Sequence, residues 1–124
     1  MSHILIVDDS PTLRKMVMAA LRPLQATFGE AGSGLEALEQ LALAPYDAVT
    51  LDLNMPDMHG LEVLEFLRNH EVYRNLPVIV VSTRDDVQAR QDMLQAGASA
   101  YITKPFQPAD FLHEVKAALA AGDR

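Results

Sequence analysis

Val49-Thr50-Leu51-Asp52-Leu53-Asn54-Met55-Pro56 is an apolar run that ends in a carboxylate and is followed by a proline turn. A short, continuous apolar run bounded by a turn signal is typical of a strand buried on both faces of a parallel sheet. We therefore predict a strand over Ala48–Asp52 whose carboxyl end presents Asp52 to solvent.

Three other apolar runs also end in polar groups. Ile4–Val7 leads into Asp8 and Asp9, a strand at Pro77–Ser82 ends in a hydroxyl, and Tyr101-Ile102-Thr103 leads into Lys104. If these strands are parallel, the polar groups converge at one pole of the sheet. In open α/β sheets this pole is where ligands bind.

Helical patterns separate the strands along the whole chain. Ser10 and Pro11 suit the start of the first helix, and Pro23 ends it. Its predicted apolar face comprises Leu13, Met16, Val17, Ala20 and Leu21. The predicted strands are 4–7, 26–31, 48–52, 77–82 and 100–103. Four helices are predicted over 11–21, 61–69, 87–96 and 108–121, and apolar residues within 35–42 mark a further helix between the second and third strands. This alternation predicts an α/β fold, a doubly wound five-stranded parallel sheet with five helices and right-handed crossovers.

The fourth predicted helix has few apolar residues. Between Thr83 and Asp92 only Val87 and Ala89 are apolar. A helix with so thin a buried stripe either shifts at low cost or is simply a well-solvated surface helix.

Length and composition limit the classes of function. The 124 residues suit one domain, 1–124, and the net charge of −7 disfavours nucleic acid and anionic membranes as partners. It favours divalent cations and basic or apolar protein surfaces. Cysteine is absent, and no signal peptide or apolar run of spanning length is visible, so we expect a cytoplasmic protein. We also expect it to be a monomer.

The carboxylates at the strand ends indicate metal and phosphoryl chemistry. If Asp8, Asp9 and Asp52 lie together, they repel one another, and Mg²⁺ would relieve that repulsion. Asp52 is the candidate nucleophile, because a carboxylate can accept a phosphoryl group. Lys104 could neutralise the transferring group, and the Ser82 hydroxyl could hydrogen-bond to it. Taken singly, each of these residues also has an ordinary structural explanation, as a turn, capping or surface residue.

In combination, these residues resemble the receiver domain of two-component response regulators, most of all single-domain receivers of the chemotaxis type. The resemblance rests on Asp8-Asp9, Asp52 within DLNMPDMHG, Ser82 in VIVVSTRDD, and QAGASAYITKPF with Lys104-Pro105. It covers the whole chain. It implies a flavodoxin-like sheet with strand order 2-1-3-4-5.

The resemblance also implies roles for the site residues. Asp52 would accept phosphate from the phosphohistidine of a histidine kinase. Asp9, Asp52 and the backbone carbonyl of Asn54 would bind Mg²⁺, and Asp8 would hold metal-bound water. Lys104 would pair with the phosphoryl group and precede a cis proline bond.

A conformational switch is implied as well. Ser82 would move toward the phosphoryl group and Tyr101 would swing inward behind it. Gly60 would permit the turn into the third helix. The face made by the fourth helix, fifth strand and fifth helix would then change and bind a downstream protein. Thr83 and Arg84 depart from the common pattern and leave the kinetics open.

Two other classes of function compete with this interpretation. A Mg²⁺-dependent aspartyl-phosphate phosphatase or phosphotransferase usually needs a second acid two residues after the nucleophile, where this chain has Asn54. A flavin binder favours glycine- and hydroxyl-rich phosphate loops and stacking aromatics. This chain has no Trp, and its first such loop is Asp8-Asp9-Ser10-Pro11.

Overall fold

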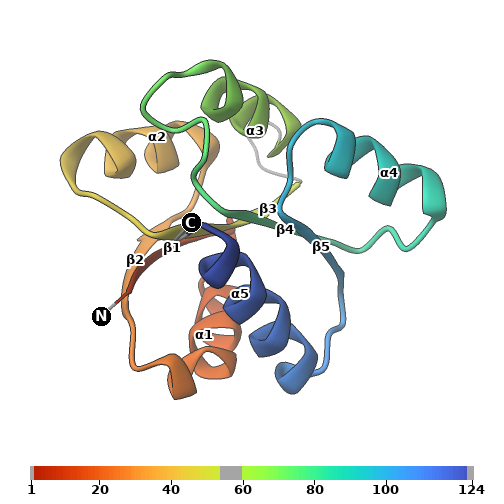
Figure 1. Cartoon of the computed structure of the whole chain (residues 1–124). Coiled ribbons are helices and arrows are strands. Elements are labelled where there is room, and N and C mark those ends of the chain that lie inside the picture. The colour runs from red at the N-terminus through yellow and green to blue at the C-terminus, as the bar shows by residue number, and fades with distance from the viewer. Residues whose placement is uncertain (1, 54–59, 123–124) are drawn as a thin grey trace.

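A parallel sheet with helices on both faces forms the centre of the computed structural model, which describes residues 2–53 and 60–122 (Figure 1). The strands are β1 (His3–Val7), β2 (Thr27–Ala31), β3 (Ala48–Asp52), β4 (Val78–Ser82) and β5 (Ala100–Thr103). The helices are α1 (Pro11–Ala20), α2 (Gly34–Leu43), α3 (Gly60–Asn69), α4 (Val87–Gln95) and α5 (Pro108–Gly122), with a 3₁₀ turn η1 (Arg22–Leu24).

The strand order is β2-β1-β3-β4-β5, and every neighbouring pair is parallel. The fold class and the strand order are therefore confirmed. Helices α1 and α5 cover one face of the sheet, and α2, α3 and α4 cover the other (Figure 1). The observed ends of the elements differ from the predicted ends by no more than two residues, because apolar runs, caps and prolines are local signals.

Side-chain caps explain where three helices begin. The hydroxyl of Ser10 accepts a hydrogen bond from the Leu13 N–H at 3.2 Å, ahead of α1. Ser33 accepts from the Glu36 N–H at 3.1 Å, ahead of α2. The Asp86 carboxylate accepts from the Ala89 N–H at 2.7 Å, ahead of α4. Each cap satisfies a donor that the first helical turn leaves unpaired.

The core has two layers, one on each face of the sheet. Val63, Leu64 and Leu67 of α3 are fully buried in one layer, as predicted, and Phe111 and Val115 of α5 in the other. The predicted apolar face of the first helix is wrong at one position, since Met16 is 55% exposed. Rotation of α1 about its axis turns Val17 and Ala20 toward the sheet and leaves Met16 at the margin.

Helix α4 has a thin buried stripe, as predicted, although only one of the two apolar residues predicted from the sequence belongs to it. Ala89 and Met93 are buried, whereas Val87 is 70% exposed at the start of the helix. The proposed low cost of shifting α4 stays a prediction. Among the described residues, no helix combines the length and apolarity needed to cross a bilayer.

Candidate functional site

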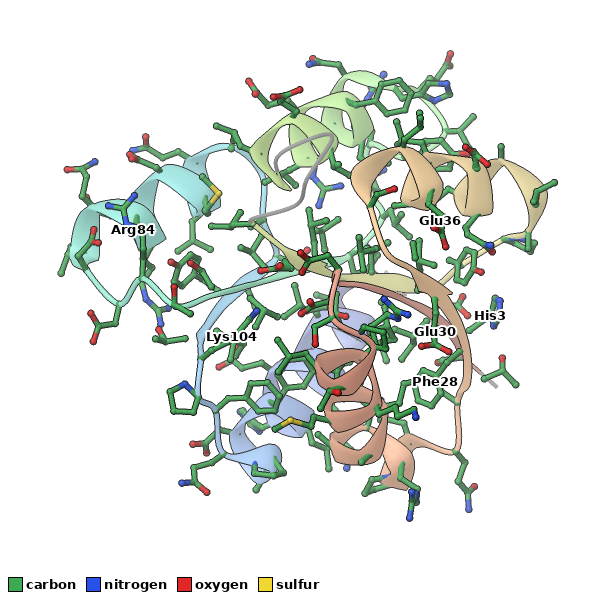
Figure 2. The ribbon with its side chains drawn as sticks, turned by 180° about the vertical axis from the view of Figure 1, so that it is seen from behind. His3, Phe28, Glu30, Glu36, Arg84 and Lys104 are labelled. Carbon is green, nitrogen blue, oxygen red and sulfur yellow. The ribbon has the colours of Figure 1, made fainter. Side chains whose placement is uncertain are left out.

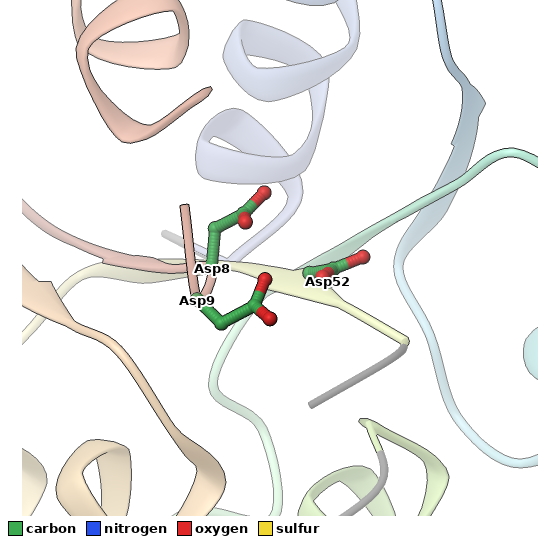
Figure 3. Close-up of side chains that lie close together, drawn as sticks. All are labelled: Asp8, Asp9 and Asp52. Carbon is green, nitrogen blue, oxygen red and sulfur yellow. The ribbon is translucent and has the colours of Figure 1, made fainter. Parts of the chain in front are cut away.

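Three carboxylates lie together where β1 and β3 end side by side (Figure 3). Asp8, Asp9 and Asp52 each place an oxygen within 4.8 Å of the others. Asp8 is 4% exposed and Asp52 is 6% exposed, while Asp9 is open to solvent. The predicted convergence of these residues is confirmed. The prediction that Asp52 is presented to solvent is wrong, because the residue is almost fully buried.

Lys104 reaches the cluster from the end of β5 (Figure 2). Its Nζ lies 3.2 Å from Asp52 Oδ1 and 3.4 Å from Asp8 Oδ2. Its backbone N–H donates to the Ser82 carbonyl at 2.7 Å, which fixes the chain beside β4. The bond from Lys104 to Pro105 is cis, as the resemblance implies.

The donor set of the cluster fits a hard divalent cation. Three carboxylates face one ammonium group, so negative charge stays in excess, and all candidate ligand atoms are oxygen. Mg²⁺ prefers such ligands and keeps several waters, which the open side at Asp9 allows. The metal ligand expected at Asn54 lies outside the described residues.

Asp8 is held on three sides. Its Oδ1 accepts from the Ser10 N–H at 2.9 Å, and its own N–H donates to the Ala31 carbonyl at 3.0 Å. Its carbonyl accepts from Arg14 Nη1 at 2.7 Å. Nothing in the sequence singles out Arg14, because an arginine one turn into an amphipathic helix resembles an ordinary surface residue.

Ser82 and Tyr101 are joined through the backbone of Arg84. The Ser82 hydroxyl, 1% exposed, accepts from the Arg84 N–H at 3.1 Å. The Tyr101 hydroxyl donates to the Arg84 carbonyl at 2.6 Å, and its ring lies inward, 3% exposed. The predicted movements of the two side chains are not tested by this arrangement.

The two departures from the common pattern, Thr83 and Arg84, are both exposed. Arg84 pairs with Asp86, with Nη2 and Oδ2 at 3.0 Å, and its side chain is largely exposed. Thr83 is exposed and helps to line a hollow of about 230 Å³ with Leu13, Met16, Lys104, Pro105 and Phe106. A larger hollow, about 510 Å³, lies among the loops that precede β3 and β4, at the opposite pole from the cluster.

The fold and site define a flavodoxin-like α/β domain with an acidic pocket that could hold a metal ion. Residues 4–116 match the family described as the response regulator receiver domain. The chain therefore belongs to that family, the signalling domains of two-component systems, whose general function is a phosphorylation switch.

Individual relatives support the same assignment. The chain is 39% identical over 107 residues to the chemotaxis protein CheY-3 of Vibrio cholerae, covering 86% of this chain and 82% of that protein. It is 38% identical over 119 residues to the transcriptional regulatory protein KdpE of Mycobacterium tuberculosis, covering 96% of this chain but 51% of KdpE. It thus spans about half the length of that relative.

Solved structures agree with the family assignment. The chemotaxis response regulator CheY4 of Vibrio cholerae superposes with a TM-score of 0.88 at 30% identity, over 95% of this chain and 98% of that one. Receiver domains as a family interact with histidine kinases and with downstream proteins.

Proposed function

We propose that this domain accepts a phosphoryl group on Asp52 from the phosphohistidine of a histidine kinase and changes its protein-binding face in response. The observation that carries the proposal is the contact of Lys104 Nζ with both Asp8 and Asp52, in a cluster completed by Asp9. A nucleophilic carboxylate, further acidic ligands and a fixed cation are together what phosphoryl transfer requires.

The transfer itself needs one bond to form and one to break. A carboxylate oxygen of Asp52 attacks phosphorus, the bond from phosphorus to the imidazole nitrogen of the donor breaks, and that nitrogen keeps the electron pair. The ammonium of Lys104 stabilises the negative oxygens of the transferring group. Asp9 and Asp52, with the Asn54 carbonyl, would hold Mg²⁺, while Asp8 would hold its water; bound Mg²⁺ supplies further positive charge to the phosphoryl oxygens.

The readout follows from the backbone of Arg84. The Ser82 hydroxyl accepts a hydrogen bond there and still has its own proton to donate, so a phosphoryl group on Asp52 can attract it. The Tyr101 hydroxyl donates a hydrogen bond to the carbonyl of the same residue, Arg84. A displacement of the Arg84 backbone would therefore move the hydrogen-bond partner of Tyr101 and the chain that leads into α4. We propose that α4, β5 and α5 form the surface that changes.

We further propose how the domain is organised and which proteins it meets. Residues 1–124 would form one receiver unit that works as a monomer in the cytoplasm and assists its own phosphorylation and dephosphorylation. Its partners would be a histidine kinase and a downstream protein. The net charge of −7 supports protein partners over nucleic acid or anionic membranes.

The nucleophile is tested with acetyl phosphate and Mg²⁺. The wild-type protein should gain one phosphoryl group, and Asp52→Asn should gain none, since an amide cannot form the acyl phosphate. Borohydride reduction followed by mass spectrometry of peptides locates the group. Asp85→Asn, which removes an exposed carboxylate from the loop before α4, is the matched control and should be labelled like the wild type. Label on Ser82 or a histidine would refute the assignment.

A further inference from the structure

Arg14 joins three segments around the acidic cluster. Its Nη1 donates to the Asp8 carbonyl at 2.7 Å, and its Nε donates to Glu30 Oε1 at 3.0 Å. Glu30 belongs to β2, on the face of the sheet that α1 covers (Figure 2). The Arg14 side chain is 17% exposed, so the guanidinium is largely withdrawn from water.

The bond to the Asp8 carbonyl acts on the peptide between Asp8 and Asp9. Because a peptide unit is planar, fixing this carbonyl also fixes the direction of the Asp9 N–H. It thereby restricts the direction in which the Asp9 side chain projects from the backbone. Asp9 is the exposed member of the cluster. Arg14 is therefore placed to hold an acidic side chain that it does not itself touch.

We propose that Arg14 is a positioning residue that sets the affinity of the acidic cluster for a divalent cation, and that Glu30 acts by holding Arg14. The inference rests on the proposed function, because it assumes that Asp9 and Asp52 bind the metal. Outer partners that orient metal ligands typically change metal affinity by about 10- to 100-fold when they are removed.

The direction in which Mg²⁺ affinity changes when Arg14 is removed distinguishes a positioning role from a purely electrostatic one. Arg14 is a cation near a cation site, so its charge alone opposes metal binding. Removing only that charge should make Mg²⁺ bind more tightly. If Arg14 orients the Asp8–Asp9 peptide, its removal should instead make Mg²⁺ bind more weakly.

The experiment is a Mg²⁺ titration of the whole domain followed by NMR. Arg14→Met should raise the Kd about tenfold or more, as expected for lost orientation of a ligand. Arg14→Lys, which keeps the charge and an ammonium donor group but lacks the guanidinium fork that contacts both partners, should recover part of the affinity. Lys15→Met removes an exposed cation from the same helix and should leave the Kd unchanged or slightly lower.

Two further measurements address the geometry directly. In metal-free Arg14→Met, the carbonyl ¹³C resonance of Asp8 should shift, because that oxygen loses its donor, while Lys15→Met leaves it in place. Glu30→Gln should weaken Mg²⁺ binding in the wild-type background and have no added effect in Arg14→Met, since it acts through Arg14. Thermal melts of all variants confirm that they are folded.

The outcomes separate this inference from the proposed function. If Arg14→Met binds Mg²⁺ as well as the wild type, or more tightly, while Asp9→Ala loses binding, the role of Arg14 is overturned and the metal site stands. If the wild type itself binds no Mg²⁺, both are overturned.

Discussion

Gly60 shows how a single residue shapes the site. Its N–H donates to the Leu53 carbonyl at 2.8 Å, so α3 begins directly against the end of β3. A Cβ at this position would lie 2.7 Å from both the Asp52 carbonyl oxygen and the Leu53 Cα. Both are backbone atoms and cannot rotate away, so the close approach requires glycine.

We therefore expect Gly60→Ala to lower the free energy of unfolding by about 1–3 kcal/mol, the usual cost of overpacking. Urea denaturation measures the change. Because the displaced backbone carries Asp52, labelling by acetyl phosphate should also slow.

Gly32→Ala is the matched control. An added Cβ there meets its nearest atom, Arg14 Nη1, at an ordinary 3.5 Å. The free energy of unfolding should change by less than about 1 kcal/mol. Equal stability of the two variants would contradict the steric argument at Gly60.

At the scale of elements, α4 is held at its ends more than along its length. Asp86 caps its first turn, and Arg68 of α3 donates through Nε to the Gly97 carbonyl at 2.9 Å, just beyond its last turn. Burial lowers the pKa of Arg68. Only Ala89 and Met93 of the helix are buried between these two attachments. This arrangement favours a helix that can shift as a unit.

The cap makes the stability of α4 depend on pH. The hydrogen bond from the Ala89 N–H lowers the pKa of Asp86 below its ordinary value of 3.8, and Arg84 lowers it further. A carboxyl with a lowered pKa in the folded state stabilises that state above its unfolded pKa, and this contribution is lost as pH falls through the folded pKa. Hydrogen exchange in Val87–Gln95, corrected for intrinsic rates, should therefore rise relative to α1 below about pH 4.

Two variants check the origin of that loss. Asp86→Asn keeps an oxygen that can cap the helix but removes the titration, so the excess exchange at low pH should disappear. Asp86→Ala should show fast exchange in α4 at neutral pH as well. If α4 in the wild type and in Asp86→Asn responded alike to acid, the cap would not be the cause.

At the scale of the whole molecule, the proposed switch links the carboxylate pole to one outer face. Beryllofluoride, a mimic of the phosphoryl group, should change hydrogen exchange in residues 82–101 more than in α1. The physical reason is that Arg84 connects Ser82 to Tyr101 and leads into α4, whereas α1 is anchored by Val17 and Ala20 in the core. A differential contact energy of a few kcal/mol is enough to reverse such a two-state balance.

The control for this experiment is Asp52→Asn with beryllofluoride, which should show no change in either region. A change confined to α1, with Val87–Gln95 unaffected, would require another signalling face.

Much of the fold and part of the site follow from the sequence alone. Apolar runs, prolines and capping residues act over a few neighbours, so they placed all five strands and five helices and located Asp8, Asp52, Ser82 and Lys104 at strand ends. The residues themselves also predicted that the carboxylates would converge. The strand order came from the resemblance, because periodicity does not say which strands are neighbours.

Other features were decided only by the tertiary structure. Lys104 and Asp8 are separated by 96 positions, and their contact depends on β1, β3, β4 and β5 being stacked in this order. Arg14 reaches Glu30 only because β2 lies beside β1, and Met16 is exposed only because of the rotation of α1 against the sheet. Local patterns determine which residues form each element, whereas the packing of elements against one another determines which side chains meet.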